Sequence, residues 1–202
     1  MEITLEPPYL IIKPDLTEED FYRLADEDAD WEYLDGRIVM HSPASPRHEQ
    51  LQGFLLTLLR AYVRDRSLGD VVGSRCPMRL DPKWSPEPDI LFVRQDRRGL
   101  MAAQRLEGPA DLVIEIASES DPGLDNREKL PRYREAGIEE IWLVDPFQKN
   151  VRVEVRTGTG YTARIVSTGW IESVAVRGFR IDASWLWQEE LPSELACLRQ
   201  IM

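Results

Sequence analysis

Two short apolar segments that each contain a carboxylate place the strongest constraint on how this chain folds. The first spans residues 88–93 and has Asp89 near its start, whereas the second spans 111–117 and has Glu115 in its interior. Ionised carboxylates are rarely buried without a partner. Two of them on neighbouring strands would repel each other unless a cation lay between them, and hard oxygen ligands suit Mg²⁺ or Mn²⁺. The pattern therefore predicts a divalent-metal site between these two strands.

The region after the second segment predicts how the strands are arranged. A helix is expected over 125–136, because Gly137 stands where a glycine commonly ends a helix. The mostly apolar run 140–144 then predicts another strand. A strand, a helix and a strand at this spacing form a crossover connection, so the strands at 111–117 and 140–144 should be parallel.

Hydrophobic periodicity and turn signals predict the other elements. Thr17 and Asp20 predict the capped start of a helix that ends among residues 26–30. Apolar residues at three- and four-residue spacing predict a helix over 46–66. The further expected elements are a hairpin of 31–34 and 37–40 around Asp35-Gly36, a strand over 71–80 weakened by Pro77, strands at 151–155, 161–166, 170–176 and 179–181, and a closing helix at 183–190.

Together these elements predict an α/β fold in which helices flank a mixed central sheet and β-hairpins lie at both ends. A chain of 202 residues can bury one sizeable core. We therefore expect a single domain over residues 1–202. It would contain an N-terminal helix and hairpin (16–45), a core (46–146) and a C-terminal β-hairpin extension (147–187).

Charge and composition exclude several classes of protein. A net charge of −11 argues against a protein that grips nucleic acid with its whole surface, because such binding depends on neutralising phosphates. No apolar run approaches the roughly 20 residues needed to cross a bilayer, and the N-terminus lacks the features of a signal peptide. Cys76 and Cys197 are too few for a disulfide framework. These features predict a cytoplasmic protein with free thiols and no membrane partner.

Any contact with nucleic acid must then come from a local group of basic residues. The connection after the Asp89 segment contains Arg94, Arg97, Arg98 and Arg105, and the preceding segment adds Arg75 and Arg79. If this connection flanks the metal site, Arg94, Arg97 and Arg98 are candidates to contact phosphates. The alternative is an ordinary solvated loop.

The order of these motifs resembles the restriction-endonuclease-like PD-(D/E)XK superfamily, and within it the Uma-type endonucleases, a family long described as a domain of unknown function. The resemblance covers residues 16–187, and the spacing of its motifs is more specific than any one of them. The matching residues are Trp31-Glu32-Tyr33-Leu34-Asp35-Gly36, His48, Pro88-Asp89, Asp111-Leu112-Val113-Ile114-Glu115-Ile116-Ala117-Ser118, Lys129, Tyr133, Gly137 and Trp142-Leu143-Val144-Asp145-Pro146.

This resemblance implies a Mg²⁺-dependent (or Mn²⁺-dependent) endonuclease that hydrolyses phosphodiester bonds of DNA. Asp89, Glu115 and the backbone carbonyl of Ile116 would be the metal ligands. The superfamily carries a lysine two residues after the glutamate, where this chain has Ala117. The resemblance implies that Lys129 replaces it from the following helix and that His48 is an accessory catalytic residue. Because cutting a duplex usually needs two active sites, a homodimer is also expected.

Each of these residues also has an ordinary structural alternative. Asp89 would then cap a turn, and Glu115 would form a structural ion pair with Lys129. Lys129 alone would be a solvated helix residue, and His48 a surface or capping residue. Glu32 would be an ordinary half-exposed strand glutamate.

Two other functions stay open at this stage. The first is a nuclease-shaped interaction module that no longer cleaves, which Ala117 and the net charge of −11 favour. The second is a metal-dependent hydrolase of a smaller phosphate ester, because a small substrate needs no long basic track.

Overall fold

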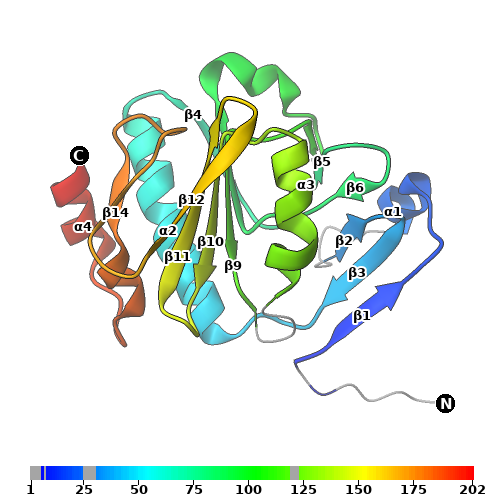
Figure 1. The fold of residues 1–202 in the computed structure, drawn as a ribbon, viewed down its shortest axis with the longest axis horizontal. Helices are drawn as coiled ribbons and strands as arrows, with labels where there is room; N and C mark the ends of the chain where they lie inside the picture. Colours follow the sequence, from blue (N-terminus) through cyan, green and yellow to red (C-terminus); the bar gives the residue numbers. More distant parts are fainter. Residues whose placement is uncertain (1–5, 7, 25–30, 119–122) are drawn as a thin grey trace.

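The computed structural model describes residues 6, 8–24, 31–118 and 123–202, and its centre is a six-stranded mixed sheet (Figure 1). Its strand order is β12-β11-β10-β9-β7-β4. Strands β9 and β10 are parallel, and every other neighbouring pair in this sheet is antiparallel. This confirms the predicted mixed sheet and crossover. The strands are β4 (Gly69–Gly73), β7 (Ile90–Arg94), β9 (Leu112–Ile116), β10 (Glu140–Asp145), β11 (Asn150–Thr157) and β12 (Gly160–Val166).

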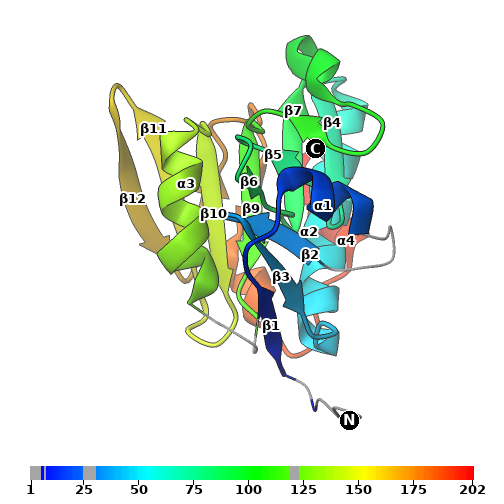
Figure 2. The ribbon, with the colours of Figure 1, turned by 90° about the vertical axis from the view of Figure 1, so that its right-hand side faces the viewer.

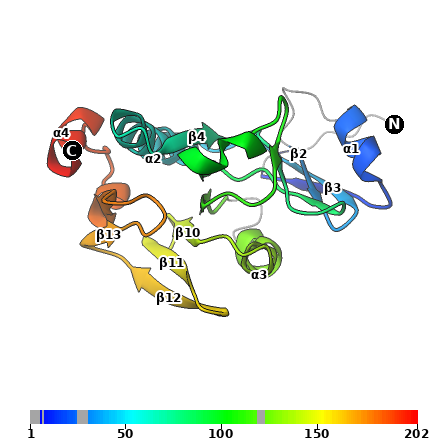
Figure 3. The same ribbon diagram turned by 90° about the horizontal axis from the view of Figure 1, so that it is seen from above.

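Two helices, α2 (Pro46–Asp65) and α3 (Leu130–Glu135), cover opposite faces of the sheet (Figure 3). Side chains alternate between the faces of a strand, so successive residues of one strand contact different helices. In β9, Ile114 belongs to the core beneath α2, whereas Val113 packs with Leu130 and Tyr133 of the α3 side. Glu115 shares its face with Val113 and therefore lies on the α3 side of the sheet.

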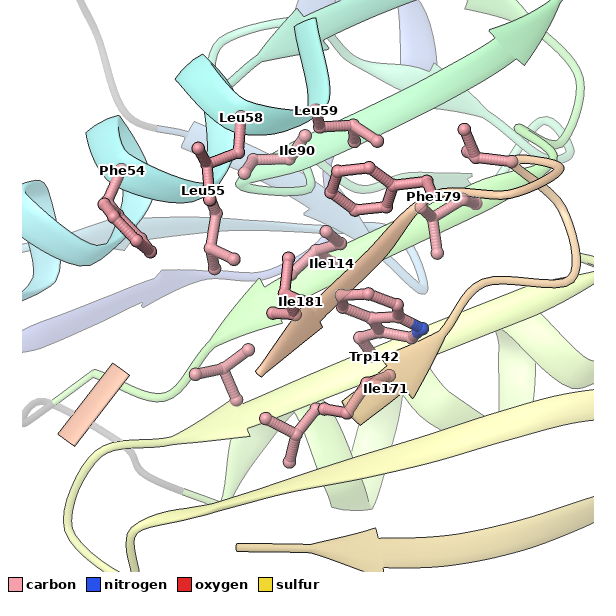
Figure 4. Packing of buried hydrophobic residues seen from close by; sticks show 14 of the residues in the cluster. Phe54, Leu55, Leu58, Leu59, Ile90, Ile114, Trp142, Ile171, Phe179 and Ile181 are labelled. Atoms are coloured by element: carbon pink, nitrogen blue, oxygen red, sulfur yellow. The ribbon is translucent and has the colours of Figure 1, made fainter. Parts of the chain in front are cut away.

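Helix α2 forms because its sequence combines a start signal with an apolar stripe. Ser45 accepts a hydrogen bond from the backbone N–H of His48 at 3.3 Å, and Pro46 occupies the first turn, where no intrahelical donor is needed. Its apolar residues are buried against the sheet and against Phe179 and Ile181 (Figure 4). Burying one such side chain contributes about 1.5–3 kcal/mol, so packing holds the helix and its N-terminus in place.

The crossover helix begins with a widened π-helical turn over Asp125–Lys129 and continues as α3. Isolated π turns of this kind occur often at functional sites. The helix ends before Gly137, whose φ of +77° favours glycine. The predicted helix over 125–136 is therefore present, with an unexpected geometry in the turn that carries Lys129.

A second, four-stranded antiparallel sheet packs beside α3 (Figure 2). Its order is β1 (Leu10–Lys13), β3 (Arg37–His41), β2 (Trp31–Leu34) and β6 (Trp84–Ser85). The predicted hairpin of β2 and β3 turns at Asp35-Gly36, which both have positive φ. Helix α1 (Glu18–Leu24) carries the predicted cap of Thr17 and Asp20; the expected end of this helix, at 26–30, lies outside the described residues.

The structure corrects the predicted strand over 71–80. The segment divides into β4 and a two-residue strand, β5 (Met78–Arg79), which pairs in parallel with β8 (Leu106–Glu107). Arg75 has a φ of +68°, which is not strand geometry, and Pro77 has no N–H to donate. These two residues interrupt the backbone hydrogen bonds that a continuous strand would need. The six-residue 3₁₀ helix η1 (Gln95–Leu100) follows β7.

The C-terminal region also differs from the prediction. Strands β13 (Trp170–Glu172) and β14 (Arg180–Asp182) form a small separate sheet, and the closing helix is a short 3₁₀ turn, η3 (Ala183–Trp187). The helix ends at Trp187 because the backbone is extended at Gln188. Pro192 follows shortly afterwards, and a proline disfavours helical geometry in the residue before it. Helix α4 (Glu194–Ile201) and strand β1 were not predicted. No helix in the described ranges is long and apolar enough to span a membrane.

Candidate active site

The sheet brings Asp89 and Glu115 together. Strand β7 pairs antiparallel with β9, and continuing the pairing of Ile90 with Ile114 by one residue places Asp89 opposite Glu115. The backbone N–H of Asp89 donates to Glu115 Oε2 at 3.3 Å. In return, Asp89 Oδ2 accepts from the backbone N–H of Ile116 at 2.7 Å. Both carboxylates are therefore held at the same edge of the sheet.

His48, from the first turn of α2, reaches this edge from the opposite side. Its Nε2 lies 3.1 Å from the carbonyl oxygen of Ile116 and 3.3 Å from Asp89 Oδ2. Burial lowers the pKa of His48, but the hydrogen bond and charge of Asp89 outweigh it and raise the pKa above its ordinary value. Two of the candidate metal ligands, Asp89 Oδ2 and the Ile116 carbonyl oxygen, therefore contact the same nitrogen of His48.

Lys129 is almost completely buried, with a relative exposure of 4%, and is surrounded by carboxylates. Its Nζ lies 2.9 Å from Glu32 Oε1, 3.1 Å from Glu115 Oε1 and 3.2 Å from Asp125 Oδ1. Burial lowers the pKa of Lys129, yet these three carboxylates raise it well above its ordinary value. Lys129 is therefore a fixed positive charge rather than a solvated helix residue.

Glu115 is buried and contacted on both oxygens. Its Oε1 accepts from Lys129 Nζ at 3.1 Å and from the hydroxyl of Tyr133 at 2.5 Å. Burial raises the pKa of Glu115 well above its ordinary value, and the charge of Lys129 acts in the opposite direction. The ion pair of Glu115 with Lys129 is therefore present, and it involves the same carboxylate that is the candidate metal ligand.

Glu32 is not the half-exposed strand glutamate that the sequence suggested, because its relative exposure is only 1%. Its Oε1 also accepts from the backbone N–H of Glu87 at 2.9 Å, and its Oε2 lies 2.9 Å from His41 Nε2. Burial raises the pKa of Glu32, but Lys129 and His41 outweigh it and lower the pKa to about 2. The apolar neighbours of Glu32 in a short strand were a signal of burial.

Asp125 was missed as a member of the site. Burial raises the pKa of Asp125, and this effect outweighs the charge of Lys129, which lowers it. The spacing of four residues between Asp125 and Lys129, repeated between Lys129 and Tyr133, did predict a polar helix face that could line a cleft, but it did not identify Asp125 as a partner of Lys129.

These side chains line one cavity of about 310 Å³. It is formed by segments that are far apart in the chain: the β2–β3 hairpin, the start of α2, the start of β7, the end of β9 and the turn before α3. The charged and histidine residues in its wall are Glu32, His41, His48, Glu87, Asp89, Glu115, Asp125 and Lys129.

The donor atoms of this cavity fit a hard divalent cation. Asp89, Glu115 and the Ile116 carbonyl supply only oxygens, the ligands that Mg²⁺ and Mn²⁺ prefer. No cluster of three or more His, Cys, Asp or Glu side chains suited to a metal occurs in the part of the chain that the structure describes. A set of two carboxylates and one backbone carbonyl does not need such a cluster.

Ala117 stands where the superfamily carries its lysine, just beyond the end of β9. It lines a smaller cavity of about 150 Å³ together with Glu115, Asp125 and Arg152. The short side chain of Ala117 leaves this space open, and the positive charge beside Glu115 comes from Lys129.

The structure places the predicted basic loop at the opposite end of β7 from Asp89, in the green helical turn at the top of Figure 1. Five residues of strand separate the two ends by about 16 Å. The loop therefore does not flank the cavity that contains Asp89 and Glu115, because the antiparallel pairing of β7 with β9 sends it to the far edge.

The arginines of this region are also paired with acids. Arg94 lies 2.5 Å from Glu139, Arg97 lies 2.7 Å from the buried Asp111, and Arg98 lies 2.5 Å from Asp70. Arg79 and Arg105 likewise pair with Glu18 and Glu107.

Comparison with known proteins identifies the family of this chain and a solved structure with a similar fold. The family model of Uma2, described as "Putative restriction endonuclease", matches residues 18–184. A similar solved structure is that of a "putative nuclease belonging to DUF820" from Anabaena variabilis ATCC 29413, with 16% sequence identity and a TM-score of 0.70. The similarity covers 85% of this chain and 97% of that one, and at this identity it shows the fold.

The search of curated proteins gave no match. The family model nevertheless spans well over half of the chain and includes every side chain of the cavity described above except Pro8. The chain therefore belongs to the Uma2 family, which is described as a family of putative restriction endonucleases.

Proposed function

We propose that this protein is a divalent-metal-dependent endonuclease that hydrolyses phosphodiester bonds of DNA. The observation that carries the proposal is that Asp89, Glu115 and Ile116 line one cavity together with the buried Lys129, whose Nζ lies 3.1 Å from Glu115 Oε1. This combination of oxygen ligands and a fixed positive charge meets the requirements of phosphodiester hydrolysis. Family membership supports the same reaction class.

Asp89, Glu115 and the Ile116 carbonyl would hold Mg²⁺ or Mn²⁺. When bound, such an ion neutralises the scissile phosphate and lowers the pKa of an attacking water. His48 Nε2 donates to the Ile116 carbonyl oxygen and lies 3.3 Å from Asp89 Oδ2, so His48 would orient these two oxygens as an accessory residue.

Lys129 would stabilise the negative charge that develops at the reacting phosphate. A preorganised donor of this kind typically contributes about 10²–10³ in rate. Glu32 and Asp125 contact its Nζ together with Glu115, so they would hold the ammonium group against the cavity. Lys129, in the helical turn that precedes α3, would thus supply the positive charge that Ala117 lacks.

The direct test is cleavage of supercoiled plasmid and of single-stranded and double-stranded oligonucleotides with Mg²⁺ or Mn²⁺. We expect cleavage that EDTA abolishes and that Asp89→Asn and Glu115→Gln both remove. Lys83→Ala, in an exposed turn outside the cavity, is the matched surface control. A wild-type protein that cuts no nucleic acid in any form with either metal would favour the non-cleaving interaction module.

A homodimer would allow both strands of a duplex to be cut in one encounter. Light scattering of the protein in solution, with and without DNA, measures this directly. A monomer that nicks one strand at a time would contradict the dimer and leave the hydrolytic reaction intact.

A hydrolase of a smaller phosphate ester is the second candidate. The acidic wall of the cavity and the distance of the arginines from it favour this alternative. Metal-dependent release of p-nitrophenol from a phosphodiester analogue, without cleavage of any polynucleotide, would select it.

A further inference from the structure

A second cavity adjoins the candidate active site at the same edge of the sheet. It has a volume of about 380 Å³ and shares Ser45 and His48 with the first cavity. Its other walls come from the turn after β10, from the end of η3 and from Ala117. A ligand that reaches the first cavity along this edge would therefore pass over or enter the second.

Two aromatic side chains from distant segments line this cavity. Phe147 has a relative exposure of 48%, although it is a large apolar residue. Asp145 Oδ1 accepts from the backbone N–H groups of Phe147 at 2.9 Å and Gln148 at 2.8 Å, which fixes the turn that carries the ring. Trp187 is half-buried, and its indole N–H donates to the carbonyl of Ser167 at 2.8 Å. The backbone that carries Phe147 and the indole ring of Trp187 are thus each fixed by hydrogen bonds before any ligand binds.

The charges around the cavity leave one exposed cation. Arg47 donates to the carbonyls of Leu186 at 2.7 Å and Gln188 at 2.9 Å, so it holds the wall together. Lys149 is exposed, and no ion pair of it occurs among the residues that the structure describes. Glu189 also lines the cavity and repels anions, so a ligand phosphate would be attracted to the side on which Lys149 lies.

We propose that this second cavity binds one unstacked nucleotide that flanks the scissile phosphate. Its base would stack on Phe147, with Trp187 beside it, and its phosphate would contact Lys149. The proposal rests on the proposed function, because the scissile phosphate must lie in the first cavity.

An aromatic ring can stack on the base of a nucleotide, and a nearby cation can contact its phosphate. Every base has a face that can stack, so such a platform binds single strands with little sequence preference. A base inside a duplex cannot reach the ring without leaving its stack. Stacking also supplies affinity that does not depend on a basic surface, which suits a chain with a net charge of −11. The preferred substrate would then be single-stranded or locally unpaired.

Binding of a fluorescent single-stranded oligonucleotide, compared with an abasic strand of the same length, tests this directly. The measurements are made by anisotropy in Ca²⁺, a hard cation that also takes oxygen ligands, and a denaturing gel checks that the strand stays intact. We expect wild-type protein to bind the base-bearing strand about 5- to 160-fold more tightly, the effect of one stacked base. Phe147→Ala should lose this preference and Phe147→Tyr should keep it. Leu195→Ala, at an exposed apolar residue outside both cavities, is the control.

Lys149→Ala should weaken the binding of both strands and reduce the salt slope by about 0.7, the value for one phosphate contact of a single strand. Lys83→Ala should leave the slope unchanged. A protein that binds both strands equally, or binds neither, would overturn the proposal.

The two proposals fail in different ways. Cleavage by wild-type protein together with an unchanged base preference in Phe147→Ala would overturn the stacking site and leave the nuclease intact. A base preference that depends on Phe147, in a protein that cuts no nucleic acid with Mg²⁺ or Mn²⁺, would support the stacking site and contradict the proposed cleavage.

Discussion

The Nζ of Lys129 lies 3.1 Å from Glu115 Oε1, and both side chains are almost completely buried. The superfamily carries a lysine two residues after the glutamate, where this chain has Ala117, and here a lysine from the following helical turn contacts that glutamate. Three carboxylates surround this ammonium group, so its charge is fixed and its position is determined by the fold.

Removing Lys129 should abolish most cleavage. We expect Lys129→Ala to reduce the Mg²⁺-dependent rate by about 10²–10³, the loss typical of one preorganised donor. It should also lower the free energy of unfolding by about 3–5 kcal/mol, because it leaves buried carboxylates unpaired. Plasmid cleavage and urea denaturation measure the two effects.

The double variant Lys129→Ala with Ala117→Lys should recover part of the rate, because a lysine at 117 would restore the superfamily pattern. Equal cleavage by wild-type protein and Lys129→Ala would show that Lys129 has no part in the reaction, while the metal site could still stand.

Glu115 should be required for metal binding. Isothermal titration calorimetry of wild-type protein with Mn²⁺ should show one main site, and Glu115→Gln should abolish it because an amide is a poorer ligand for a hard cation. Glu154→Gln is a control at another buried glutamate, which pairs with Arg134 and Arg152. Unchanged Mn²⁺ affinity in Glu115→Gln would remove this residue from the site.

Glu32 should affect catalysis by positioning Lys129. Glu32→Gln keeps an acceptor for the N–H of Glu87 and removes the charge that faces Lys129. Supporting residues of this kind typically contribute about 10–100-fold, and we expect the loss in kcat with little change in KM or in Mn²⁺ affinity. A loss in Mn²⁺ affinity of the same size would instead make Glu32 a metal ligand.

The arginine loop should contribute little to binding DNA. Arg98 pairs with Asp70, and its helix lies at the far end of β7 from the cavity, so Arg98→Ala should leave the salt dependence of binding unchanged. A slope reduced by about 0.7–0.9 would show a phosphate contact there, as the sequence first suggested.

The cap of α1 should be sensitive to acid. Hydrogen bonds from Thr17 lower the pKa of Asp20 from 3.8 to about 2. A carboxyl with a depressed pKa in the folded state stabilises the fold above its unfolded pKa, and this contribution is lost as the pH falls through the folded value. We expect the amide of Thr17 to lose protection between about pH 4 and pH 2 in NMR spectra. Asp20→Asn should remove this transition, and a transition that persists in it would assign the effect elsewhere.

Local patterns were sufficient to predict the core of the fold. The stripe of apolar residues in α2, the apolar strands β7, β9 and β10, and the cap at Thr17 all depend on interactions within a few residues. The adjacency of Asp89 and Glu115 was also predicted, although it requires the antiparallel pairing that places the start of β7 beside the end of β9.

The sequence by itself therefore determined which segments form the sheet and which carboxylates it carries. Only the tertiary structure decided what faces those carboxylates. The antiparallel pairing of β7 sent the arginines to the far edge, and the packing of the β2–β3 hairpin against α3 brought Glu32 to Lys129. Such contacts join residues that are distant in the chain, and their energy depends on burial that no local pattern records. A buried charge is stable only where its partners converge, and that convergence exists only in the folded molecule.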